Sequence, residues 1–281
     1  MTPSVDAIIR AFPQLEDNRS LPVSIDGGQN ALVLDLGTHI ARIAHYPGQE
    51  QIFTRESAVL KLFGPRLPLP VPAISLKNVA GTPVAVHEKL PGNPLITLSD
   101  LNTAQVRNVA GQLTGFLQTL HELPVTPFEQ LGVPVEDATF WEGWLAAVRA
   151  RLYPLIADHA IERFDQHAAK FLADYRRLAF GVKHGDFGSG NILAGDGKIT
   201  GIIDFGSAAI GDVASDIAGL AASYGDPFLD MIAETYPEVH AMKPRVAFYR
   251  LAFAAMEALH GLEHGDGDAL QAGLATLDRS R

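Results

Sequence analysis

Three polar residues in the second half of the chain have the types and spacing that phosphoryl transfer requires. Asp186 follows a His-Gly pair, Asn191 lies five positions later, and Asp204 begins an Asp-Phe-Gly triplet. Transfer of phosphate from a nucleotide needs an acid that orients or deprotonates a hydroxyl, and oxygen ligands that hold magnesium on the phosphates. The spacing therefore predicts a kinase and leaves open what it phosphorylates.

The segment between Asn191 and Asp204 predicts a β-hairpin that brings these two side chains together. Apolar runs flank Asp196-Gly197, which is a strong signal for a two-residue turn. With that turn, Asn191 lies opposite Ile202, and Asp204 lies two residues further along on the same face. Such diagonal neighbours are about 7–8 Å apart, so both side chains could share magnesium ions on one triphosphate. Asp186 projects beside this site from a glycine-rich loop without being a ligand.

Each of these motifs is weak when it occurs alone. An Asp and an Asn at this spacing are common, and an Asp-Phe-Gly triplet is usually a turn. The two motifs in this order, connected by a hairpin, rarely occur together by chance, so their combination indicates a kinase. His184, which precedes the predicted base, is expected to pack and hydrogen-bond within the loop rather than to take part in the chemistry.

The N-terminal part of the chain predicts a small β-rich unit that presents a cation. A hairpin is expected over residues 23–43 with Gly27-Gly28 in its turn, where backbone N–H groups could approach phosphates, although a plain turn is the commoner meaning. Arg42 lies between apolar strand residues, where a charge is costly unless it is paired. A helix predicted over 50–63 offers Glu56 as its partner, and a solvated helix acid is the alternative.

A strand predicted over 84–90, ended by Pro91-Gly92, marks where the chain of a two-lobed kinase would cross between its lobes. The proline-rich run 67–72 breaks regular structure before it. The backbone near Glu88 and Leu90 would then hydrogen-bond the purine, and a simple exit from the strand is the alternative. The residues predicted to bind the nucleotide are Gly27, Gly28, Asn30, Arg42, Glu56, Glu88 and Leu90.

These motifs together resemble those of the aminoglycoside phosphotransferase family, small-molecule kinases that share the protein-kinase-like fold. The matching segments cover nearly the whole chain: Arg42, Glu56, 67–72, 184–191, 202–206, 211–216 and 257–265. The resemblance implies Asp186 as the catalytic base, Asn191 and Asp204 as Mg²⁺ ligands, and ATP or GTP as the phosphate donor. Arg42 departs from the lysine of many relatives, and Ser207 replaces an acid that often follows the Asp-Phe-Gly triplet.

The resemblance also implies an α+β, two-lobed fold. The expected lobes are a small β-rich one over residues 1–89 and a larger, mainly helical one over residues 90–281. Its helices are predicted over 102–122, 139–156, 164–178, 214–224 and 245–262. Trp141 and Trp144 are expected in the core or a groove wall rather than as a stacking platform, and Asp216 is expected to hold the catalytic loop by hydrogen bonds.

The composition narrows the class of partner. The chain has 281 residues, a net charge of −10 and no cysteine, which is compatible with the cytoplasm and excludes disulfides. It shows neither the apolar core of a signal peptide nor a membrane-spanning run. The acidic balance argues against nucleic acid and modestly favours a cationic partner, with ordinary solubility as the alternative. The oligomeric state is not defined by the sequence, and a monomer is favoured.

The predicted substrate is a small cationic molecule, with an aminoglycoside antibiotic as the leading candidate. Four acidic residues near the C-terminus could bind its amines if they face the cleft: Glu257, Glu263, Asp266 and Asp268. A macrolide kinase and a metabolic kinase for an amino alcohol or sugar are alternatives. The string from His260 to His264 also matches a zinc peptidase pattern, and a non-catalytic kinase-like module is a further alternative. Whether antibiotic resistance is the biological role is left open.

Overall fold

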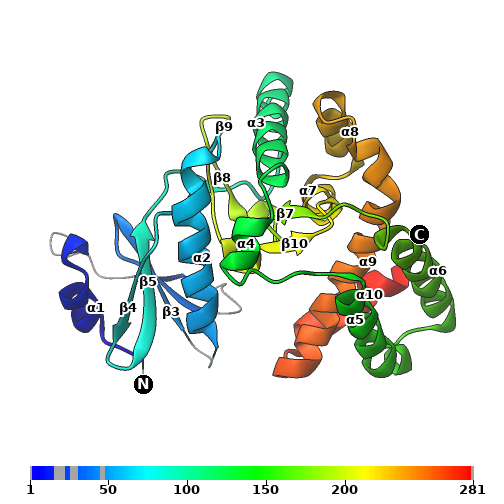
Figure 1. Cartoon of the computed structure of the whole chain (residues 1–281), viewed down its shortest axis with the longest axis horizontal. Coiled ribbons are helices and arrows are strands. Elements are labelled where there is room, and N and C mark those ends of the chain that lie inside the picture. Colours follow the sequence, from blue (N-terminus) through cyan, green and yellow to red (C-terminus); the bar gives the residue numbers. More distant parts are fainter. Residues whose placement is uncertain (1, 16–22, 26–30, 45–47, 280–281) are drawn as a thin grey trace.

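The computed structural model describes residues 2–15, 23–25, 31–44 and 48–279. Within these ranges the N-terminal part forms an antiparallel sheet in the order β1-β2-β3-β5-β4 (Figure 1). Its strands are β1 Val23–Ile25, β2 Ala31–Asp35, β3 His39–Ala44, β4 Ser75–Val79 and β5 Thr82–Glu88. The predicted hairpin and the predicted strand before Pro91 therefore both belong to this sheet, and their extended conformation is confirmed.

Two helices cover opposite faces of the sheet, α1 (Val5–Ala11) and α2 (Gln49–Phe63) (Figure 1). Alternate residues of the strands point to opposite faces. Ala41 and Ile43 therefore join the core beneath α1. Ala85, which is paired with Arg42 across β3 and β5, packs with Phe53 of α2 on the other face. The alternation thus places Arg42 on the face that α2 covers.

The rest of the chain is mainly helical and surrounds one large apolar core (Figure 1). Its helices are α3 Thr103–His121, α4 Thr126–Gln130, α5 Ala138–Arg151, α6 Asp158–Tyr175, α7 Ala214–Tyr224, α8 Asp226–Thr235, α9 Val239–His264 and α10 Gly267–Arg279. Trp141 is buried at the centre and Trp144 is half-buried, so the predicted core role of this pair is confirmed. The α+β architecture predicted from the sequence is also confirmed. None of the helices in the described ranges is both long and apolar enough to cross a bilayer.

Several predicted helix ends were wrong. Helix α5 ends at Arg151 rather than 156, because Pro154 lacks the N–H that would continue it. Helix α6 begins six residues before the predicted start at 164. Helix α9 begins at Val239 and contains Pro244, since burial of the apolar side chains around the proline compensates for the lost backbone hydrogen bond.

Two small sheets lie between the lobes and carry the polar motifs. Strand β7 (Gly181–Lys183) pairs with β10 (Ala209–Gly211), and β8 (Ile192–Gly195) pairs with both β6 (Asn93–Pro94) and β9 (Lys198–Ile202). The β8–β9 hairpin has the predicted turn, but its register shifts by one residue beyond Ala194.

That shift corrects the predicted pairing of Asn191 with Ile202. Ile202 pairs instead with Ile192, and the N–H of Ile203 donates to the carbonyl of Asn191 over 3.0 Å. The extra residue on β9 is Thr200, whose hydroxyl donates to the carbonyl of Pro91. A β-bulge of this kind inserts one residue into one strand. Its position could not be predicted from the sequence of the hairpin.

Candidate active site

The catalytic loop runs from the end of β7 to the start of β8 and is organised by a buried histidine. The His184 side chain is fully buried and packs against the rings of Phe187 and Phe205. Its Nε2 lies 3.0 Å from the Ile203 carbonyl, and its Nδ1 lies 3.3 Å from the backbone N–H of Asp186. Because a carbonyl only accepts and an N–H only donates, the Nε2–H of His184 donates to Ile203 and its Nδ1 accepts from Asp186. This is the structural role that was predicted for it.

One face of α7 holds the loop at three points. The Asp216 carboxylate accepts the backbone N–H groups of His184 and Gly185 at 2.8 and 2.9 Å, as predicted. One turn further on, a Cβ at Gly219 would lie 2.5 Å from the Phe187 carbonyl, so the absence of a side chain lets loop and helix touch. After another turn, the Ser223 hydroxyl accepts the N–H of Ser189 at 2.9 Å. Spacings of three and four residues place all three contacts on one stripe of the helix.

Gly185 is the glycine of this loop with the least space for a side chain. Its φ is +85°, and an added Cβ would collide with the backbone carbonyl of Ser207. We therefore expect Gly185→Ala to lower the free energy of unfolding by more than about 1 kcal/mol, since alanine is strained at positive φ, and to reduce turnover with it. Gly190→Ala is the matched control in the same loop, because no atom lies within 4 Å of a Cβ built there. Equal denaturant midpoints for the two variants would contradict this expectation.

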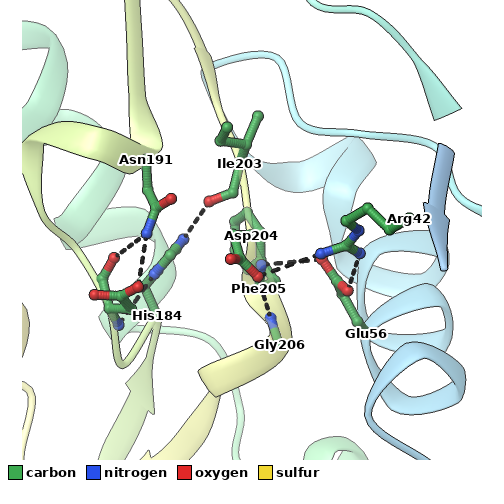
Figure 2. Close-up of polar contacts among 9 residues, drawn as sticks. Arg42, Glu56, His184, Asn191, Ile203, Asp204, Phe205 and Gly206 are labelled. Carbon is green, nitrogen blue, oxygen red and sulfur yellow. Dashed lines mark hydrogen bonds and ion pairs between the residues drawn. The ribbon is translucent and has the colours of Figure 1, made fainter. Parts of the chain in front are cut away.

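The two predicted metal ligands converge, although not by the predicted register. Asn191 ends a 3₁₀ turn, and Asp204 has left-handed backbone angles of φ 62° and ψ 69°. Both residues thus leave the regular strands, and their side chains approach one another (Figure 2). The Asn191 Nδ2 donates to the backbone carbonyl and to Oδ2 of Asp186 at 2.9 and 2.8 Å.

That amide orientation suits a hard cation. Since the Nδ2 of Asn191 is used on Asp186, its Oδ1 is turned toward Asp204 (Figure 2). Asp204 contributes an exposed carboxylate to the same space. An amide oxygen and a carboxylate are the ligand types that Mg²⁺ takes in nucleotide sites, with water and phosphate oxygens completing the set. The residues present therefore fit a magnesium ion.

Arg42 and Glu56 face this pair from the small lobe, as predicted. The Arg42 guanidinium forms an ion pair with the buried Glu56 carboxylate, and its Nη1 lies 3.3 Å from Oδ1 of Asp204 (Figure 2). Glu56 also accepts the backbone N–H of Phe205 at 3.1 Å. Burial raises the pKa of Glu56, and the charge of Arg42 opposes that rise. Within the described part of the chain, the buried Nε of Arg42 has no hydrogen-bond partner.

Loss of the Glu56 charge should disturb both lobes. We expect Glu56→Gln to lower kcat/KM for the nucleotide at least about tenfold, because removing one charge of a buried pair costs more than the 1.4 kcal/mol that a factor of ten represents. Glu50→Gln, at an exposed position in the first turn of α2, is the control. Steady-state kinetics with varied nucleotide will test this. Equal kcat/KM for both variants would show that the pair plays no part in nucleotide use.

The remaining residues predicted to bind the nucleotide lie in two groups. Gly27, Gly28 and Asn30 lie outside the described residues. Glu88 ends β5, and its carbonyl lies 2.7 Å from Nδ1 of the buried His87. Leu90 packs closely against Gly201 of β9, so this segment passes directly over the hairpin that carries Asp204. Burial lowers the pKa of His87.

The four acidic residues near the C-terminus lie together around the junction of α9 and α10, and all are exposed. Two of them have partners within the protein. Glu263 forms an ion pair with Arg151 of α5. Asp266 accepts the backbone N–H groups of Asp268 and Ala269, both at 3.1 Å, and so caps α10. Glu257 lies on α9, two turns before its end.

The zinc peptidase alternative finds no support at the same junction. The rings of His260 and His264 stack with centroids 4.2 Å apart. Among the described residues, however, no group of three or more His, Cys, Asp or Glu side chains could hold a metal ion.

Sequence reasoning missed the residues that support the loop from behind. Gly219 and Ser223 were not predicted, although their spacing from Asp216 follows the period of a helix. His121, the last residue of α3, was also missed. It contacts Asp216 across 95 positions of sequence, and no local pattern signals such a contact.

Comparison with known proteins gives one family. Residues 23–249 match the phosphotransferase enzyme family. Viomycin phosphotransferase from Streptomyces vinaceus is 29% identical over 221 residues, which cover 75% of each chain.

Solved structures share the fold. The GDP and kanamycin complex of APH(2'')-IIIa superposes with a TM-score of 0.87 at 22% identity, covering 97% of this chain and 96% of that one. The macrolide 2′-phosphotransferase MphH from Brachybacterium faecium gives a TM-score of 0.72 at 19% identity, covering 99% of both chains. At these identities the likeness concerns the fold alone, and it confirms the two-lobed, kinase-like architecture.

Proposed function

Because this chain belongs to the aminoglycoside phosphotransferase family of phosphotransferase enzymes, we propose that it moves the terminal phosphate of ATP or GTP to a hydroxyl of a small cationic molecule, with an aminoglycoside antibiotic as the leading candidate. The observation that carries this proposal is the convergence of Asp186, Asn191 and Asp204 opposite the Arg42–Glu56 pair. The nucleotide binds between a lobe of residues 1–89 and a lobe of residues 90–281.

Each residue has a distinct task in this proposal. Asn191 and Asp204 hold Mg²⁺, which would neutralise charge on the phosphates. Arg42, fixed by Glu56, would present its guanidinium to phosphate oxygens. Asp186 orients the acceptor hydroxyl and takes its proton as the new oxygen–phosphorus bond forms and the nucleoside diphosphate leaves. Most of the rate would come from placement and from charge neutralisation.

Charge supports a cationic acceptor. The chain carries a net charge of −10, and Glu257, Glu263, Asp266 and Asp268 add an exposed acidic group at the α9–α10 junction. The relatives named above include a viomycin phosphotransferase and a phosphotransferase in complex with kanamycin. We extend this class of antibiotic acceptor to this chain. Long-range attraction would raise the local concentration of such a substrate.

A nucleotide-consumption screen tests the proposal directly. Purified protein is mixed with ATP or GTP, Mg²⁺ and one acceptor at a time from three classes: aminoglycosides and cyclic peptide antibiotics, macrolides, and small amino alcohols or sugars. We expect acceptor-dependent turnover with the cationic class, and mass spectrometry should show a product heavier by one phosphate. Turnover confined to neutral sugars would reject the cationic acceptor, and turnover confined to macrolides would reject the aminoglycoside candidate. Release of phosphate without acceptor would reject the transfer itself.

A further inference from the structure

A second histidine lies behind the catalytic loop, outside the proposed reaction. His121 ends α3, and its side chain is only 4% exposed. Its Nε2 lies 3.2 Å from Oδ2 of Asp216, and its Nδ1 lies 3.2 Å from the hydroxyl of Tyr236. The imidazole therefore connects the end of α3 to α7 and to the residue that follows α8.

The Asp216 carboxylate depends on its hydrogen-bond donors. It is fully buried, yet it accepts the N–H groups of His184 and Gly185 as well as the Nε2–H of His121. Burial acts to raise the pKa of Asp216, but the hydrogen bond and charge of His121, the charge of His184 and the N–H of Gly185 hold that pKa below its ordinary value. An ionised carboxylate only accepts hydrogen bonds, so the nitrogen of His121 that faces it carries a hydrogen.

One oxygen of the Asp216 carboxylate links His121 to the loop that carries the predicted base, Asp186. Oδ2 of Asp216 receives both His121 and the backbone N–H of His184, and Asp186 follows His184 by two residues. We propose that His121 is a positioning residue for phosphoryl transfer: by donating to Asp216 it keeps that carboxylate ionised and in place, and so sets the position of the Asp186 carboxylate. This inference rests on the proposed function.

The charged and titratable groups around this contact come from each element packed there. His121 approaches Asp216 from α3, His184 from the catalytic loop, and Tyr236 from the end of α8. Burial raises the pKa of Tyr236 to about 12, with the charges of Glu238, Glu122 and Asp216 adding to it, so its phenol stays neutral at working pH. Asp216 is thus the group whose ionisation depends on His121.

Two kinds of substitution distinguish loss of the hydrogen bond from residue 121 to Asp216 from loss of side-chain packing at that position. Gln at position 121 can place its amide N–H where the Nε2–H of the imidazole lies, so His121→Gln keeps the donor. His121→Leu fills the space without a donor. His121→Asn ends at the Nδ1 position and cannot reach Asp216, and it serves as a second donor-deficient variant if the leucine variant does not fold. Tyr236→Phe removes the other partner and leaves the bond to Asp216 intact.

The measurements are kcat, KM for the nucleotide, and the unfolding midpoint, each followed from pH 5 to 8. We expect the donor-deficient variants to lose about 10- to 100-fold in kcat, the scale of a misplaced reacting group, with little change in KM. His121→Gln and Tyr236→Phe should remain close to the wild type. Without the donor, only the loop contacts oppose burial, and we expect the pKa of Asp216 to rise above its value in the unfolded chain.

The sign of the pH effect then distinguishes positioning from packing. A carboxyl with a raised pKa in the folded state loses stability as pH rises through that pKa. The unfolding midpoint of the donor-deficient variants should therefore fall with pH relative to His121→Gln, which also lacks the imidazole, while their kcat recovers as Asp216 ionises. A constant offset at all pH values, or a glutamine variant as impaired as the leucine variant, would overturn the inference. If the wild type transfers phosphate to no acceptor, the proposed function fails, and the pH trend of the midpoints alone decides the role of His121.

Discussion

Replacement of Asp186 by alanine is expected to lower turnover by about 10²- to 10⁴-fold, the range that general base catalysis supplies, while nucleotide binding stays intact. The carboxylate is exposed at the mouth of the loop, and its Oδ2 is held by the Nδ2 of Asn191 at 2.8 Å. It is not a proposed metal ligand, so its removal should leave the magnesium–nucleotide complex bound. Single-turnover phosphate transfer and calorimetric titration with a non-hydrolysable nucleotide measure the two properties separately.

The control for this variant is Asp278→Ala. Asp278 is an exposed carboxylate on α10, far along the chain from the loop, and its removal changes the net charge by the same amount. Both kcat and nucleotide affinity should stay at wild-type values there. If Asp186→Ala also turned over at a near-normal rate, the assignment of Asp186 as the base would be rejected.

Replacement of Asp204 by asparagine should have a different effect, because it acts on the metal. The amide can still accept from Arg42 and from the N–H of Gly206, which Oδ1 of Asp204 contacts at 3.3 and 3.4 Å. The charge that Asp204 offers to Mg²⁺ and to Arg42 is lost. A metal acting as a Lewis acid contributes several kcal/mol, so we expect kcat/KM to fall at least about 100-fold. The Mg²⁺ concentration for half-maximal rate should rise as well.

Asp196→Asn provides the matched control on the same hairpin. Asp196 is exposed at the opposite end of β8–β9, in a turn where its φ is 51°. Asparagine is favoured in such turns, so the fold should be kept. Magnesium titrations of both variants with saturating nucleotide will show whether the requirement changes only for Asp204→Asn. An unchanged magnesium profile for that variant would remove Asp204 from the metal site.

The features that could be predicted from the sequence are those determined by residues close together in the chain. The β8–β9 turn is given by Asp196-Gly197, and the extent of α2 by its apolar spacing, and both were found. The pairing of Arg42 with Glu56 was also predicted, because a charge in a buried strand requires a nearby opposite charge. These inferences need only one element and its immediate neighbour.

The remaining features depend on contacts between distant segments. The bulge at Thr200 forms where the hairpin meets the chain at Pro91, and the early start of α9 depends on burial against other helices. Asn191 and Asp204 lie at the same end of the β8–β9 hairpin, but their predicted pairing was wrong, since both lie outside the regular strands. The residues assigned to binding the nucleotide and the substrate remain a prediction.

The stripe of Asp216, Gly219 and Ser223 on α7 also bears on how this chain can change in length. Each residue inserted within α7 between Asp216 and Ser223 would rotate the residues beyond it by about 100°, because an α-helix has 3.6 residues per turn. The contacts before and after the insertion could then no longer face the loop together. Insertions and deletions between Asp216 and Ser223 should therefore be eliminated by selection.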